Sequence, residues 1–188
     1  MGRVVYYLDS NVLISFLFEN EEHHRVVEVF LLKLTTCGEG PLYTSTFSLT
    51  EAMNALCRKL RSREQVIWPL NIYIEKLGGA NACVLITSFL VSFIETSLKV
   101  KIIDDPSFYG FEKLNSTSIP LVFKQAIELT SVIDIRVKDL LHVAYALLLK
   151  RLRGVKYIIT LDIDEFSKIK DKLERQLELS VIFPSKPA

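Results

Sequence analysis

The stretch that most constrains the fold is the apolar run Val4–Leu8, together with the polar residues Asp9-Ser10-Asn11 that end it. A continuous apolar run bounded by a polar turn predicts a strand that is buried on both faces. Apolar residues resume at Val12 and predict a helix, which either polar residue after Asp9 can cap. Asp9 is therefore expected at the carboxyl end of an inner strand, where open α/β sheets bind ligands. Taken alone, it is equally well explained as a turn or capping residue.

Strand and helix patterns alternate along the rest of the chain, and its 188 residues suit one domain with a full core. We expect this domain over residues 1–183, followed by a tail at 184–188. Residues 107–118 are predicted to form a loop. Further strands are predicted at 42–45, 100–104, 155–160 and 181–183, and helices at 20–36, 48–60, 64–76, 81–99, 119–130, 136–151 and, as helix or loop, 168–179.

The composition argues against several classes of protein. The net charge is +1, so no overall field draws the chain to nucleic acid or membrane, and any such attraction must be local. The longest apolar stretches, 83–94 and 140–149, are too short to span a bilayer, and Asp9 interrupts what would be the core of a signal peptide. The three cysteines are widely spaced without a Cys-x-x-Cys motif, which argues against zinc and disulfides and favours the cytoplasm.

Four acidic residues are expected at equivalent positions of the fold. Asp9 and Asp162 lie just past inner strands, and Glu51 and Asp139 lie in the first turns of buried helices; Asp164 is a candidate fifth. Asp139 is the most informative, because helical spacing puts it on the same inward stripe as His142, and a buried acid is costly unless it is paired or binds a metal. The structural alternative for Glu51 is a favourable interaction with the helix dipole.

Helices that follow parallel strands start at the carboxyl ends of those strands, so these acids can converge on one crevice. Converging carboxylates repel each other, and a hard divalent cation such as Mg²⁺ or Mn²⁺ resolves the repulsion. A metal held in this way can activate water and stabilise an in-line displacement at phosphorus. The residue types therefore point to phosphodiester hydrolysis without a covalent enzyme intermediate.

The order of these motifs resembles the PIN-domain family, metal-dependent ribonucleases that include the VapC-type toxins of prokaryotic toxin–antitoxin pairs. Four blocks carry this resemblance: Tyr6–Leu13, Thr44–Ala52, Lys138–Ala146 and Ile158–Phe166. The resemblance implies a three-layer α/β/α fold with a central, mainly parallel sheet, in a protein that is often dimeric. The helical pair at 64–101 would be an addition to this fold, serving as a lid, a dimer surface or an RNA-contacting arm.

By position, the resemblance implies the roles of individual residues. Asp9, Glu51, Asp139 and Asp162 would be the catalytic, metal-binding acids, with Asp164 assisting. The residues that would orient ligands or water are Ser10, Asn11 and Thr160. Two basic clusters are either solvated helix ends or contacts to the RNA backbone: Arg58, Lys59 and Arg61, and Lys150, Arg151 and Arg153.

These features predict a Mg²⁺- or Mn²⁺-dependent endoribonuclease, either a toxin with a small antitoxin partner or an RNA-maturation factor. One rival is a phosphotransfer hydrolase with Asp9 as nucleophile, but that class commonly has a second Asp two residues on, where this chain has Asn11. Another is an inactive RNA-binding or assembly module, which the retention of four acids argues against.

Overall fold

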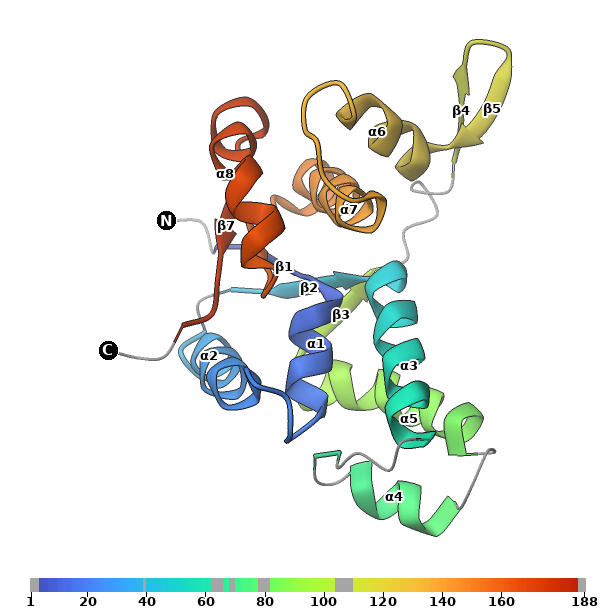
Figure 1. The fold of residues 1–188 in the computed structure, drawn as a ribbon, viewed down its shortest axis with the longest axis vertical. Coiled ribbons are helices and arrows are strands. Elements are labelled where there is room, and N and C mark those ends of the chain that lie inside the picture. Colours follow the sequence, from blue (N-terminus) through green and yellow to red (C-terminus); the bar gives the residue numbers. More distant parts are fainter. Residues whose placement is uncertain are drawn as a thin grey trace.

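A five-stranded parallel sheet forms the centre of the computed structural model, which describes residues 4–38, 40–61, 66–67, 70–77, 82–103 and 110–185 (Figure 1). The strand order is β3-β2-β1-β6-β7, and every neighbouring pair is parallel. Each strand overlaps a segment for which the sequence predicts one, and only β7 begins outside it, one residue earlier than predicted. The strands are β1 (Tyr6–Leu8), β2 (Leu42–Ser45), β3 (Val100–Ile103), β6 (Tyr157–Ile159) and β7 (Ser180–Ile182).

Helices cover both faces of this sheet, as the alternating side chains of β1 show. Tyr6 and Leu8 pack into a core with the first group of helices, whereas Tyr7 packs into a second core with the other group. The predicted three-layer α/β/α fold is therefore confirmed. The first group is α1 (Ser10–Leu17), α2 (His24–Thr36), α3 (Thr46–Arg61) and α5 (Ala82–Thr96), and the second is α6 (Leu121–Leu129), α7 (Val137–Arg153) and α8 (Ile163–Leu177).

The region between α3 and β3 contains two helices, as the sequence predicts. The first, α4 (Leu70–Leu77), packs on α5, and residues 62–65 lie outside the described ranges. Ile86, Leu90 and Ile94 of α5 are buried in the core that also contains α1. The second helix is thus part of the layer covering the sheet; that the region is an addition to a smaller fold stays a prediction.

The loop predicted at 107–118 is wrong where the structure describes it. Strands β4 (Phe111–Leu114) and β5 (Thr117–Pro120) form an antiparallel hairpin that projects from the body beside α6 (Figure 1). Asn115 adopts a left-handed conformation with φ of 55°, which suits a two-residue hairpin turn. Glu112 accepts a hydrogen bond from Lys124 at 2.6 Å and ties the hairpin to α6.

Two further features bear on the site. Helix α3 begins at Thr46, so Glu51 lies in its second turn rather than in the predicted first turn, and its role as a dipole partner is weakened. Helix α7 ends at Arg153, and its C-cap residue Gly154 adopts a left-handed conformation.

In the described part of the chain, no helix is both long and apolar enough to cross a membrane.

Candidate metal centre

The candidate site lies at the point of the sheet where the order of the strands reverses. From β1 the chain passes outward through β2 and β3, then returns to β6 on the other side of β1. Asp9 follows β1 as the N-cap residue of α1, and Thr160 follows β6. The carboxyl ends of two such neighbouring strands form the crevice that binds ligands in open α/β sheets.

The amide of Asn11 joins these two turns. Its Nδ2 donates hydrogen bonds to Asp9 Oδ2 at 2.9 Å and to Thr160 Oγ1 at 3.0 Å. Its Oδ1 accepts a hydrogen bond from the backbone N–H of Leu161 at 3.0 Å. The Asn that distinguishes this chain from a phosphotransfer hydrolase therefore has a structural role, because it holds the turn after β1 against the turn after β6.

The hydroxyl of Thr160 uses its full hydrogen-bonding capacity. It donates to Asp9 Oδ2 at 2.7 Å and accepts from Asn11 Nδ2 and from the backbone N–H of Asp162, the latter at 3.1 Å. Since Thr160 is fully buried, these contacts have no water to replace them.

Thr160→Val is expected to destabilise the protein by about 1–3 kcal/mol, because a buried carboxylate oxygen and two donors lose a partner. Urea denaturation measures the change, and Thr160→Ser, which keeps the hydroxyl, is the matched control. Equal stability of the valine variant and the wild type would contradict the role given to this hydroxyl.

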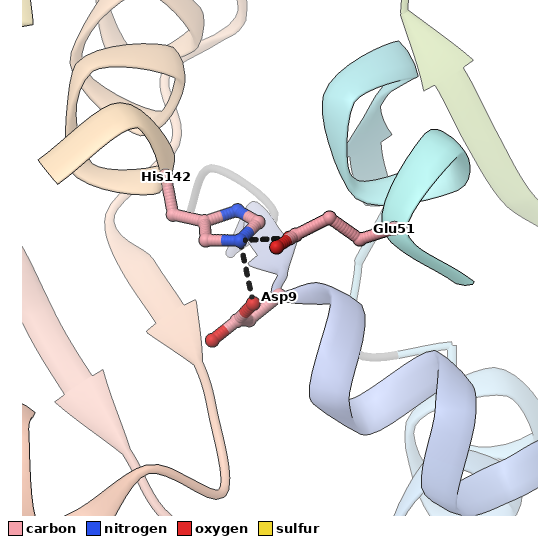
Figure 2. A group of neighbouring side chains, drawn as sticks. All are labelled: Asp9, Glu51 and His142. Carbon is pink, nitrogen blue, oxygen red and sulfur yellow. Dashed lines mark hydrogen bonds and ion pairs between the residues drawn. The ribbon is translucent and has the colours of Figure 1, made fainter. Parts of the chain in front are cut away.

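His142 of α7 lies between two of the predicted acids (Figure 2). Its Nε2 is 3.0 Å from Asp9 Oδ1 and 2.8 Å from Glu51 Oε2. No role for His142 is predicted from the sequence, although it follows Asp139 by three residues on the buried stripe of the same helix. This spacing is the sequence feature that could have placed His142 in the site. Ser10 completes the group, because its Oγ donates to Glu51 Oε2 at 2.7 Å and lies 3.2 Å from Asp9 Oδ1.

The second ring nitrogen of His142 also has a partner. Nδ1 lies 3.0 Å from the Tyr7 hydroxyl and 3.3 Å from Ser48 Oγ. The Tyr7 hydroxyl is in turn 3.0 Å from Ser45 Oγ and from Ser48 Oγ, so it can accept from the imidazole and donate onward. Both ring nitrogens of His142 can therefore carry protons that are hydrogen-bonded.

The pKa values of these groups reflect their mutual contacts. Burial lowers the pKa of His142, but the charge of Asp9 and the hydrogen bonds to Asp9 and Glu51 outweigh it and hold that pKa well above its ordinary value. Burial raises the pKa of Asp9, but the charge and hydrogen bond of His142, with that of Thr160, lower it to about 2. For Glu51, burial is outweighed by the hydrogen bonds from His142 and Ser10, and the pKa is lowered. The group is therefore an imidazolium between two carboxylates.

Asp139 and Asp162 form a second pair, joined by Arg136. The guanidinium Nε donates to Asp139 Oδ2 at 2.9 Å, and Nη2 forms an ion pair with Asp162 Oδ2. Burial raises the pKa of Asp139, and the charges of Lys138 and Arg136 offset only part of this rise. The charge of Asp9 raises the pKa of Asp139 further, which shows that the pair Asp139 and Asp162 interacts with the group around Asp9. The structure thus brings all four predicted acids to one end of the sheet. Asp164 is exposed and lines an open hollow with Asn11, Lys138 and Asp162.

Comparison with protein-family models finds a match over part of the chain. Residues 6–80 match the PIN domain, a segment that includes Asp9 and Glu51. This match supports an assignment of the chain to the PIN-domain family. A search of curated proteins finds no match to it.

Among solved structures, the chain is similar to VapBC2 from Rickettsia felis bound to a DNA fragment from their promoter, with a TM-score of 0.52 and 14% identity over 97% of this chain and 100% of that one. It also resembles VapC20 from Mycobacterium tuberculosis, a sarcin–ricin loop cleaving toxin, with a TM-score of 0.44 and 13% identity over 81% and 86% of the two chains. The first of these likenesses supports the fold.

The donors at the acidic end of the sheet suit a divalent cation. Asp9, Glu51 and His142 each offer one ligand atom, and these atoms lie within 4.8 Å of one another. Mg²⁺ and Mn²⁺ prefer carboxylate oxygen, whereas imidazole is more typical of zinc, copper, iron and nickel. The carboxylates are therefore the residues that would hold Mg²⁺ or Mn²⁺. The structure also shows a second way to balance their charge, which the sequence analysis did not consider: His142 and Arg136 are cations supplied by the chain itself.

The two basic clusters predicted to bind RNA lie at the far ends of the helices that carry the acids. Arg151 follows Asp139 by twelve residues on α7, about 18 Å along the helix axis. Arg61 follows Glu51 by ten residues on α3, about 15 Å. Lys59 pairs with Glu21 at 2.6 Å and Lys150 with Glu178 at 2.7 Å. Contact with RNA near the scissile bond is therefore not supported by their position, and a role further along the strand stays a prediction.

Proposed function

We propose that the chain is a PIN-domain endoribonuclease of the cytoplasm that depends on Mg²⁺ or Mn²⁺. The observation that supports this most strongly is the gathering of four acids at the switch point of the sheet, two of them buried. An accumulation of buried carboxylates is costly for stability, which favours a functional reason for it.

Each residue of the site has a distinct proposed role. Asp9, Asp139 and Asp162 would hold the metal most directly, and Asp164 would assist from the open hollow. When bound, the metal would make a water molecule more acidic and stabilise the charge that develops on the phosphate. Glu51 is less buried than Asp9, and its Oε2 is held by Ser10 and His142, so it is placed to orient the attacking water and accept its proton.

Metal removal and Glu51→Gln test this proposal together. RNA oligonucleotides are incubated with wild type in Mg²⁺, in Mn²⁺ or in EDTA, with a DNA strand of the same sequence alongside. We expect cleavage of RNA with either metal, none in EDTA, and a loss of about 100-fold in Glu51→Gln, in the range that a general base contributes. The variant, purified in parallel, also controls for contaminating ribonuclease. Cleavage in EDTA, or equal cleavage by the variant, would exclude the proposed chemistry.

The narrower role is that of a toxin with a small antitoxin partner. It is favoured over RNA maturation by the resemblance of the sequence motifs to VapC-type toxins, together with the fold shared with VapBC2. Inducing the chain in cells should stop growth, and co-expression of the product of a neighbouring gene should restore it. Growth that continues during active RNA cleavage would favour the maturation role. Dimerisation stays a prediction.

A further inference from the structure

Arg136 occupies an unusual position at the start of α7. It is the N-cap residue of that helix, and its side chain reaches over to the N-cap residue of α8, Asp162. One guanidinium thereby joins carboxylates from two helices, and its Nε is also 4.0 Å from Glu165 Oε2. Yet the side chain is 51% exposed, whereas that of Asp139 is only 2% exposed. Arg136 therefore closes the outer side of the acidic site.

Both oxygens of Asp162 have a partner in this arrangement. Its Oδ1 accepts a hydrogen bond from the backbone N–H of Glu165 at 3.2 Å, which caps α8, and its Oδ2 pairs with Arg136. Asp139 likewise gives Oδ2 to Arg136. A carboxylate that binds a cation directly does so through its oxygens. Arg136 thus competes with a metal for one oxygen of Asp139 and one of Asp162.

We propose that Arg136 alternates between two sets of partners: the carboxylates of Asp139 and Asp162, and a non-bridging oxygen of the RNA phosphate when those carboxylates hold the metal. This inference rests on the proposed nuclease function and assigns a substrate-binding residue to it. The guanidinium is planar with five N–H donors and binds carboxylates and phosphates with the same fork geometry. A long, half-exposed side chain can exchange one anion for the other without a backbone movement.

The alternative is that Arg136 is a permanent brace between α7 and α8. Its exposure argues against this, because water screens an ion pair made by a half-exposed guanidinium, and such a pair holds two helices together only weakly. Position also favours the exchange. Arg136 lies at the mouth of the site beside the open hollow that Asp162 lines, whereas the predicted RNA-binding clusters lie at the far ends of α3 and α7.

Calorimetric titration with Mn²⁺ and kinetic assays on one RNA oligonucleotide, applied to wild type and Arg136→Gln, test the exchange. Removal of a competing cation should tighten Mn²⁺ binding about 10-fold. The size is that of changes at groups next to metal ligands, and the sign is opposite to the usual loss because the group removed is itself positively charged. Loss of the phosphate contact should lower kcat/KM for RNA at saturating Mn²⁺ about 100-fold. Tighter metal binding together with weaker cleavage is a combination that a brace does not produce.

Lys138→Gln is the matched control, since it removes a positive charge whose Nζ lies 4.0 Å from Asp139 Oδ1. Without a hydrogen-bonded fork, its Mn²⁺ affinity should change by less than about 3-fold. Arg136→Lys keeps the charge without the fork, so its cleavage should fall about 10-fold while Mn²⁺ affinity stays close to wild type. If Arg136→Gln does not fold, as judged by thermal melting, the results for Arg136→Lys decide the test.

The outcomes separate this inference from the proposed function. If wild type binds Mn²⁺ and cleaves RNA but Arg136→Gln does not bind Mn²⁺ more tightly, or cleaves as well as wild type, the exchange is wrong and the nuclease proposal stands. Equal tightening in Lys138→Gln would show a general field effect and also overturn the exchange. If wild type neither binds Mn²⁺ nor cleaves RNA, the proposed function fails first and the inference fails with it.

Discussion

Asp9→Asn is expected to reduce RNA cleavage about 1000-fold, which corresponds to about 4 kcal/mol of transition-state stabilisation. Asp9 is buried, and every contact of its side chain leads to another part of the site: His142, Thr160, Asn11 and Ser10. Asn has nearly the same shape, and its one oxygen can accept the bonds made to one of the two carboxylate oxygens, although its NH2 group cannot accept the others. It lacks the negative charge, and metal-assisted phosphodiester hydrolysis depends on that charge.

The measurement is kcat/KM on an RNA oligonucleotide at saturating Mn²⁺, with Mn²⁺ affinity determined on the same preparations. Asp171→Asn is the control, because it makes the same change of charge at an exposed position further along α8. Its cleavage should stay within about 3-fold of wild type, as expected for a screened surface charge. If Asp9→Asn cleaves as fast as this control, Asp9 is not part of the catalytic site.

The central sheet could be predicted because parallel strands that are buried on both faces must be nearly all apolar. Strands β1, β2 and β6 are short apolar runs that end in polar residues, and each of those turns faces the site. The hairpin of β4 and β5 gives no such signal. Phe111 is exposed, and polar residues alternate with apolar ones without a buried face, so the segment reads as a loop.

The acids could be placed from the sequence, but their partners could not. A carboxylate after a strand has few positions available, since strand and turn fix its backbone. The side chains of His142 and Arg136 reach residues far away in the sequence, Asp9 and Glu51 for His142 and Asp162 for Arg136. Those contacts depend on how the start of α7 lies relative to the residues that follow β1 and β6 and to α3, which no local pattern encodes. The convergence of carboxylates was thus predicted, whereas the cations between them were not.

The two cations, His142 and Arg136, balance the charge of the acids in different ways. His142 is 1% exposed and lies inside the site, so its contacts determine whether the buried Asp9 and the partly buried Glu51 can be tolerated together. Arg136 is half exposed and contacts its acids from outside, so its charge is more strongly screened by water than that of His142. Loss of His142 should therefore affect folding, whereas loss of Arg136 should affect binding.

His142→Gln is expected to lower the free energy of unfolding by about 3–5 kcal/mol near pH 6 in EDTA, because Asp9 and Glu51 lose their buried cation. The effect should depend on pH. The pKa of His142 is raised well above 6.5 on folding, so its stabilisation is complete below about pH 6.5 and is lost as the pH rises through the folded value. Asp9, whose pKa falls to about 2, contributes above pH 3.8 and loses that contribution toward pH 2.

The difference between wild type and His142→Gln should consequently be largest between about pH 4 and 6.5 and become smaller above that range. Urea denaturation at about pH 5.5 and about pH 9 measures it. His24→Gln is the matched control, since His24 is also buried but its Nδ1 contacts the backbone carbonyl of Ser15. A difference for His142→Gln that is the same at both pH values would mean that its imidazole stabilises the fold by packing rather than by charge. Added Mn²⁺ should raise the stability of wild type more at pH 9 than at pH 5.5, because the metal and the proton of His142 balance the same carboxylates.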